Sequence, residues 1–338
     1  MAITISVLDQ SPIYPGETPE EAFLHTIKLA QLSEQLGFRR FWVSEHHDSG
    51  QVAGSSPEVL ISHLLAKTES IRIGSGGIML QHYSPYKVAE NFNVLASLAP
   101  GRVDLGVGRA PGGLPRSTQA LQQGSFEPSS LTDKIIELEK YVHNRLEEDH
   151  PLAGLKAGPI PGTPPEIYVL GASVASAEIA AGLGLPYVFS LFINGDQAIA
   201  LEAIETYRNN FETSPGKEPR AIIALSVLAA ETEEEAKELA GAHKLIRINL
   251  ASGKTLTVAT REQAEEFTRQ STEDYTIEER EPEITKGTKA SVRQQLLALS
   301  SASGVDEFIV TTNVQPFDKR LRSFELLHEA LAEVPAEA

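Results

Sequence analysis

Short apolar runs alternate with longer amphipathic segments along the whole chain. A glycine closes several amphipathic segments just before an apolar run, as Gly37 does before residues 41–43 and Gly304 before residues 308–310. Glycine is common just past a helix end, and a β-branched or aromatic run after it is typical of a buried strand. The opposite joints carry helix-start signals, such as Thr18 followed by Pro19. The pattern predicts eight strands, at residues 3–9, 39–44, 71–79, 102–108, 166–170, 186–190, 221–229 and 306–311.

This alternation predicts an α/β fold, a (β/α)8 TIM barrel that forms one domain over residues 1–338. A doubly wound open sheet is the alternative. Its dinucleotide-binding form is disfavoured, because no clean G-x-G-x-x-G follows the first strand. Between the seventh and eighth strands, residues 252–287 form a highly charged, weakly periodic insertion. Insertions of this size are often functional, so we expect a mobile lid, with a solvated surface excursion as the alternative.

Charge and composition narrow the function classes. Lys and Arg number 29 against 46 Asp and Glu, a net charge of −17, which argues against nucleic-acid or anionic-membrane binding. The absence of cysteine excludes disulfides, thiolate metal sites and cysteine nucleophiles. No apolar stretch approaches the roughly 20 residues that cross a bilayer, and the N-terminus does not resemble a signal peptide. We therefore expect a cytoplasmic protein.

The active site of such a barrel is expected at the C-terminal ends of its strands. Four predicted strands carry distinctive residues there. They are an acid–base cluster at 44–48, a run of small residues at 74–77, Arg109 on a glycine-rich turn, and a serine-rich helix start at 173–176.

Arg109 and the helix start at 173–176 together favour a phosphate site. The free N–H groups of a first helical turn, here those of Val174 and Ala175, attract an anion, and the hydroxyls of Ser173 and Ser176 can add hydrogen bonds. Arg109 can supply a fixed charge. Separately, Ser173 is as well explained as an ordinary helix cap, and Arg109 as a surface ion-pair partner.

The glycines between residues 74 and 77, including Gly76 and Gly77, suggest a second feature. Strand interiors avoid glycine, and bare backbone at a strand end allows a flat ligand to lie against it. A tight bend or bulge of the barrel is the alternative.

His46 and His47 are candidates for acid–base chemistry. Adjacent residues on a strand point in opposite directions, so we expect only one of them to face the site, as a general base. Adjacent histidines are a poor chelate, and no H-E-x-x-H motif is present, so we expect no metal. His82, near the third strand end, is the one other histidine that we consider.

Taken together, these segments resemble the bacterial luciferase-like family of flavin-dependent monooxygenases and oxidoreductases. The resemblance is carried by the Glu45-His46-His47 cluster and by residues 71–78, 89–92, 100–109 and 171–178. It implies a TIM barrel that binds FMN, which a separate flavin reductase reduces. The reduced flavin then reacts with O2 to oxygenate a small organic substrate. Family members pair as dimers, so a homodimer is expected.

The resemblance also assigns roles to single residues. His46 is implied as the catalytic histidine, and Gly76 and Gly77 as a non-proline cis peptide under the flavin ring. It further implies that Arg109 and residues 173–176 (Ser173, Val174, Ala175 and Ser176) hold the FMN phosphate, and that the insertion at 252–287 closes over reduced flavin.

Some of the sequence departs from this pattern. Gly108 stands where true luciferases carry a reactive cysteine, and the C-terminal third, which shapes the substrate pocket, matches only loosely. Light emission and substrate therefore do not transfer. Three alternatives stay open. They are a flavin-binding relative without turnover, a deazaflavin-dependent dehydrogenase of the same fold, and a phosphate-binding lyase or isomerase that uses His46 and Glu45 as acid and base.

Overall fold

The structure, a computed structural model, describes residues 3–123, 129–214, 216–241, 245–251, 255–258, 260–271 and 273–332. Eight parallel strands close into a barrel, because β12 pairs with β1 at one side and β6 pairs with β7 at the other. Each strand lies within one residue of its predicted bounds, and the (β/α)8 fold is confirmed. The barrel strands are β1 (Thr4–Asp9), β2 (Arg40–Val43), β3 (Arg72–Met79), β4 (Val103–Gly108), β5 (Glu166–Gly171), β6 (Tyr187–Ser190), β7 (Ala221–Ala229) and β12 (Glu307–Thr311).

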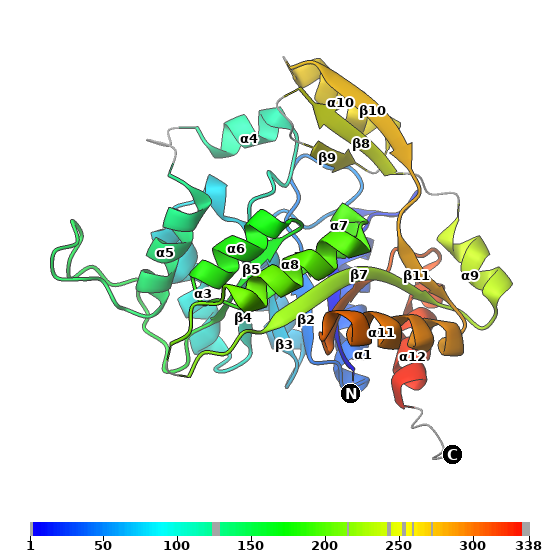
Figure 1. The fold of residues 1–338 in the computed structure, drawn as a ribbon, viewed down its shortest axis with the longest axis horizontal. Coiled ribbons are helices and arrows are strands. Elements are labelled where there is room, and N and C mark those ends of the chain that lie inside the picture. The colour runs from blue at the N-terminus through cyan, green and yellow to red at the C-terminus, as the bar shows by residue number, and fades with distance from the viewer. Residues whose placement is uncertain are drawn as a thin grey trace.

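Helices cover the outside of the barrel (Figure 1). Seven of them connect successive barrel strands: α1 (Pro19–Gln35), α2 (Pro57–Lys67), α3 (Pro85–Leu98), α5 (Leu131–Val142), α6 (Val174–Gly182), α8 (Gln197–Asn209) and α11 (Lys289–Ser303). An eighth, α12 (Phe317–Ala332), follows the last strand. Shorter helices lie in the loops: η1 (Leu80–His82), α4 (Pro115–Leu121), α7 (Leu191–Asn194) and α9 (Glu233–Ala240).

The predicted start of α1 is confirmed in atomic detail. The hydroxyl of Thr18 accepts the backbone N–H of Glu21 at 3.3 Å, and the Glu21 carboxylate accepts the N–H of Thr18 at 2.8 Å. Two N–H groups that the helix leaves unbonded are thereby satisfied, and Pro19 supplies a first helical residue that needs no N–H.

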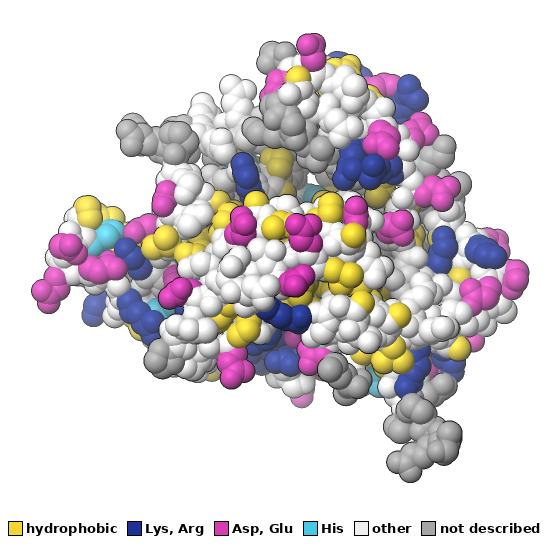
Figure 2. All heavy atoms as spheres, in the orientation of Figure 1, with side chains coloured by type: hydrophobic (Ala, Val, Ile, Leu, Met, Phe, Trp, Pro, Cys, Tyr) yellow, Lys and Arg dark blue, Asp and Glu magenta, His cyan; other side chains and the backbone are white. Residues whose placement is uncertain are grey.

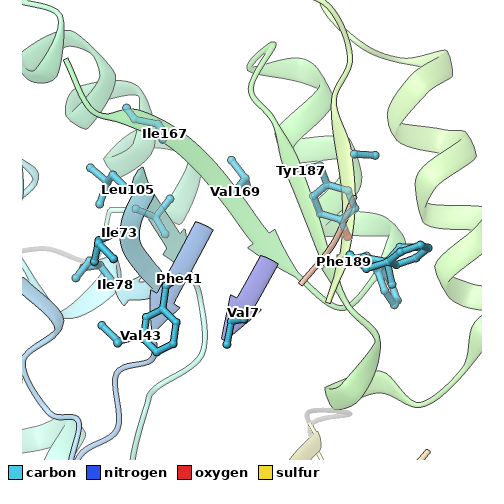
Figure 3. Packing of buried hydrophobic residues seen from close by; sticks show 14 of the residues in the cluster. Val7, Phe41, Val43, Ile73, Ile78, Leu105, Ile167, Val169, Tyr187 and Phe189 are labelled. Carbon is cyan, nitrogen blue, oxygen red and sulfur yellow. The ribbon is translucent and has the colours of Figure 1, made fainter. Parts of the chain in front are cut away.

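Alternate residues of each strand build two cores. Those that point outward, such as Phe41, Ile167 and Val169, pack under the helices (Figure 3). Those that point inward, such as Trp42 and Tyr168, fill the barrel with side chains. Successive side chains of a strand point to opposite faces, and here both faces are buried. These strands are therefore hydrophobic on both faces.

A buried ion network that the sequence analysis missed lies at the N-terminal end of the barrel. Arg40 is fully buried; its guanidinium donates to Asp104 at 2.8 Å, to Glu307 at 2.6 Å and to the hydroxyl of Tyr168 at 2.6 Å. These residues come from β2, β4, β12 and β5. The network fixes the end of the barrel opposite to the one expected to carry chemistry.

The insertion is more regular than its weakly periodic sequence suggests, because it folds into strands and a helix. It contains β8 (Leu245–Leu250), β9 (Thr255–Val258), α10 (Arg261–Gln270) and β10 (Tyr275–Arg280), and the three strands form an antiparallel sheet. The sheet begins before the predicted start at 252, because residues 245–250 alternate apolar and polar side chains, a strand pattern that the sequence analysis overlooked. A last strand, β11 (Ile284–Gly287), returns to the barrel and pairs with β7.

The insertion lies over the C-terminal ends of the barrel strands. Figure 1 shows its sheet and α10 above the barrel, on the side of α4 and α7. The side chain of Gln270 accepts the N–H of Arg116 on α4 at 3.0 Å, and Leu114 packs against Ile248 and Phe267. The insertion is therefore anchored to the loop that follows β4. Among the described residues, no helix is long and apolar enough to cross a membrane.

Candidate functional site

The four predicted strand ends lie side by side at one rim of the barrel. Strands β2, β3, β4 and β5 are consecutive neighbours, with Val43 opposite Ser75, Met79 opposite Gly108, and Val107 opposite Val169. Residues 44–48, the Gly76 region, Arg109 and residues 173–176 therefore share this rim.

His46 has one ring nitrogen available. Its Nδ1 lies 3.1 Å from the hydroxyl oxygen of Ser44, and its backbone N–H donates to the carbonyl of Gly54 at 2.8 Å. Its Nε2 has no hydrogen-bond partner within the described part of the chain. Burial, and then the charge of nearby His47, lower the pKa of His46 to about 4. His46 is therefore a neutral imidazole near pH 7.

His47 is held by neighbouring side chains instead. Its Nε2 lies 2.7 Å from a carboxylate oxygen of the buried Glu45, and the same oxygen accepts the hydroxyl of Tyr83 at 2.8 Å. The other Glu45 oxygen accepts the N–H of Met79 at 3.0 Å. Glu45 thus ties the end of β2 to the end of β3. The expectation that only one of the two histidines is free for chemistry agrees with these contacts, and that one is His46.

The Glu45 contacts also bear on the lyase or isomerase alternative. That mechanism needs Glu45 beside His46, whereas the Glu45 carboxylate is occupied by His47 and Tyr83. Burial raises the pKa of Tyr83, and the Glu45 carboxylate raises it further, so Tyr83 stays a neutral hydrogen-bond donor. The sequence analysis gave Tyr83 no role, and its only signal was a position just after the third strand.

The peptide between Gly76 and Gly77 is cis, as the resemblance implies. The register of β3 against β4 shifts between Ser75 and Ile78. A Cβ on Gly76 would lie 2.7 Å from the Leu8 side chain, and one on Gly77 would lie 2.8 Å from the Gly106 carbonyl oxygen. Barrel packing alone therefore requires glycine at these two positions. This agrees with the alternative explanation, a tight bend or bulge of the barrel. Gly76 is partly exposed, so part of its backbone is accessible to solvent.

Arg109 is exposed at the end of β4. It makes no hydrogen bond or ion pair with any described residue, so the alternative of a surface ion-pair partner has no support there. The turn after it, with Gly112 at a φ of 65°, packs against the backbone of Glu45 and His47. His82 belongs to this support, since its Nε2 lies 2.8 Å from the Pro111 carbonyl oxygen.

Ser173 is the N-cap of α6, so the simple capping explanation is correct for its hydroxyl. That hydroxyl accepts the N–H of Ser176 at 3.3 Å, and the Ser176 hydroxyl donates to the Ser173 carbonyl at 2.6 Å. Tyr187, which the sequence analysis did not select, supports the turn, with its hydroxyl 2.9 Å from that of Ser176. The N–H groups of Val174 and Ala175 belong to the first turn and have no partner inside the helix.

The rim thus combines Arg109, which has no partner among the described residues, with the open first turn of α6, the partly exposed backbone at Gly76 and the neutral imidazole of His46. The first two attract a phosphate or another oxyanion. The backbone at Gly76 and the imidazole of His46 can face a flat neutral ring. Among the described residues, no group of three or more His, Asp or Glu side chains is placed to hold a metal ion.

Comparisons with a family model, with relatives and with solved structures all point to the same protein family. The family model described as luciferase-like monooxygenase matches residues 1–313. The chain is 42% identical to the N-acetyl-S-alkylcysteine monooxygenase of Bacillus subtilis over 330 residues, which cover 97% of this chain and 98% of the relative. It is 33% identical to a luciferase-like monooxygenase of Escherichia coli over 98% of both chains. Among solved structures, apo-MsnO8 superimposes with a TM-score of 0.80 at 33% identity over 99% of both chains.

Proposed function

The chain belongs to the luciferase-like monooxygenase family, and we propose that it is an FMN-dependent, two-component member. In this proposal a separate reductase supplies reduced flavin, and a small organic substrate is oxidised with O2. The observation that carries the proposal is Arg109, which has no partner among the described residues, at a strand end next to those that carry the open first turn of α6 and the neutral His46.

The residues of the rim fit FMN. The phosphate would accept hydrogen bonds from the N–H groups of Val174 and Ala175 and from the Arg109 guanidinium. The ring would lie against the partly exposed backbone at Gly76. Ser173 and Ser176 shape the turn, and their hydroxyls can add bonds only by leaving the cap contacts that they now make.

Reduced FMN, when bound, supplies the two electrons with which one oxygen atom of O2 enters the substrate while the other leaves as water. The chain provides a site for this reaction. His46 presents a neutral imidazole, and when Ser44 donates to its Nδ1, its Nε2–H can donate a hydrogen bond toward the ring side of the rim. Such a positioned group contributes roughly 10²- to 10⁴-fold to proton-dependent steps.

The insertion is well placed to exclude water, and we propose that it is the lid over the bound flavin. The outer strand β10 is exposed along its whole length, while α10 docks on α4, the helix that follows the Arg109 turn. Residues 252–254, 259 and 272 of the predicted lid lie outside the described residues. Hydrogen exchange over residues 245–280 should slow when reduced FMN binds, and unchanged exchange there would contradict a closing role.

We also propose that two copies form a homodimer through the outer faces of α2 and α3. These neighbouring helices leave large apolar side chains exposed, with Val59 67% and Leu98 68% accessible. Leu98→Asp should convert the dimer to a monomer in light scattering. Leu152→Asp, at another exposed leucine, should not.

The proposed activity is tested with a flavin reductase, NADH, FMN, O2 and candidate thioethers. N-acetyl-S-methylcysteine is the first candidate, because a relative acts on N-acetyl-S-alkylcysteines. Product that contains one oxygen atom from ¹⁸O₂ is expected. His46→Ala should slow its formation at least a hundredfold, with flavin affinity changed only a few-fold, while His150→Ala, at a histidine in the loop between α5 and β5 that pairs with Glu137, should have no effect. If the chain binds flavin but forms no O2-dependent product from any substrate of a panel, it is a flavin-binding relative without turnover. Preference for a deazaflavin over FMN would indicate the dehydrogenase alternative.

A further inference from the structure

A second pocket lies between the insertion and α7, at the same end of the barrel as the rim. It has a volume of about 200 Å³ and is open to solvent. Figure 2 shows this face hollowed below the insertion, with a patch of Lys and Arg side chains at one edge of the hollow. The residues that line it and matter here are Phe192, Ile193 and Asn194 from α7, Arg247 from β8, Thr257 from β9 and Arg280 from β10.

The sheet of the insertion has two unlike faces. Ile246 and Ile248 are buried on the face that packs against α10. Because strand residues alternate, Arg247 projects from the opposite face, where it lies in register between Thr257 on β9 and Glu278 on β10. That face forms one wall of the pocket, and α7 forms another.

Arg247 is a cation that no described residue pairs with. It is half-buried, yet it makes no hydrogen bond or ion pair within the described part of the chain. Its cross-strand neighbour Glu278 pairs instead with Arg280, at 3.1 Å. A partly desolvated guanidinium next to Phe192 and Ile193 is stabilised by an anion that brings its own hydrogen-bond acceptors. The two carboxylates at the edge of the pocket, Glu281 and Glu283, are exposed to solvent and form no hydrogen bond or ion pair with Arg247.

The pocket adjoins the proposed flavin site. The side-chain amide of Asn194 donates to the carbonyl of Ala172 at 2.8 Å, one residue before the α6 cap. A small molecule with one end under the sheet can therefore reach toward the rim. Arg109 and the first turn of α6 already provide for a phosphate, which leaves Arg247 for a different anion.

From these contacts we infer that Arg247 binds the carboxylate of the substrate, while Phe192 and Ile193 contact its apolar part. The inference rests on the proposed function and adds the substrate class, a small organic acid. Arg247 could equally bind another oxyanion, the phosphate of FMN. The experiment therefore distinguishes the substrate carboxylate from the FMN phosphate.

The test compares N-acetyl-S-methylcysteine with its carboxamide, which has the same shape without the charge. Binding of each to the FMN-loaded chain is measured by saturation-transfer NMR, and FMN affinity is measured in parallel. We expect the acid to bind and the amide to bind at least tenfold more weakly. Arg247→Gln should weaken binding of the acid roughly 10- to 100-fold, the usual effect of a lost charge-assisted hydrogen bond, with no change for the amide. Arg269→Gln, an exposed arginine on α10 that pairs with Glu266 outside the pocket, is the matched control and should leave acid binding unchanged.

Three results would overturn the assignment. They are absence of acid binding to the wild-type chain at millimolar concentration, equal binding of acid and amide, and acid binding that survives Arg247→Gln. Weaker FMN binding in Arg247→Gln, with acid binding intact, would assign Arg247 to the phosphate instead. Failure of the proposed function has a different signature, because the wild-type chain would then not bind FMN in either redox state.

Discussion

The Nδ1 atom of His46 lies 3.1 Å from the hydroxyl oxygen of Ser44, whereas the adjacent His47 is bound by the Glu45 carboxylate at 2.7 Å. Two consecutive histidines thus have separate tasks. His47 helps to hold the ends of β2 and β3 together, and His46 keeps one nitrogen free at the rim.

The neutral state of His46 gives a pH prediction. Its pKa of about 4 lies below the ordinary value of 6.5, so the unfolded chain binds the proton more readily than the folded chain between these values. Its contribution to stability is complete above about pH 6.5 and is lost as the pH falls toward 4. A ¹H–¹⁵N titration of the His46 ring should show no protonation at pH 6, and a midpoint between pH 6 and 7 would contradict this environment.

The role of Arg109 is tested by comparing two flavins. Arg109→Ala should raise the Kd for FMN about 10- to 100-fold, because a charge-assisted contact to the phosphate is lost. The Kd for riboflavin, which lacks the phosphate, should change little. Arg145→Ala, an exposed arginine after α5, serves as the control. Equal losses for FMN and riboflavin would place Arg109 away from the phosphate.

The open first turn of α6 is tested by removing one N–H group. Val174 is the first helical residue, and Ser173 before it has an extended backbone, so proline fits at this position. Val174→Pro should therefore fold and yet bind FMN more weakly, while Val174→Ala controls for the lost side chain. If both variants bind FMN as the wild type does, the backbone amide of Val174 does not contact the phosphate.

The buried network at the other end of the barrel governs stability. Arg40→Ala removes the buried guanidinium that Asp104 and Glu307 share, so each buried carboxylate loses a charged hydrogen-bond donor, and the free energy of unfolding should fall by about 3–5 kcal/mol. Arg39→Ala removes a neighbouring arginine that is 49% exposed and lies 3.7 Å from Glu307. It should cost less than about 1 kcal/mol. Similar losses from both, measured by urea unfolding, would contradict a special role for Arg40.

The barrel strands could be predicted almost residue by residue, because short apolar runs bounded by glycines and helix caps are local features. The rim followed from them, since the ends of neighbouring parallel strands must meet. The Arg40 network could not be predicted, because its members lie far apart in the sequence and nothing local marks them. Arg247 was missed for a related reason. It lies in β8, residues 245–250, where the sequence analysis expected no strand, and only the folded chain shows that it has no partner among the described residues.

The central claim is that Arg109, the first turn of α6 and the backbone at Gly76 form a site for reduced FMN. Anaerobic titration of the purified chain with reduced FMN tests this most directly. The account predicts one saturable site per chain with a dissociation constant in the micromolar range or below, weakened by Arg109→Ala. No saturable binding of reduced FMN, or binding that Arg109→Ala leaves unchanged, would contradict it.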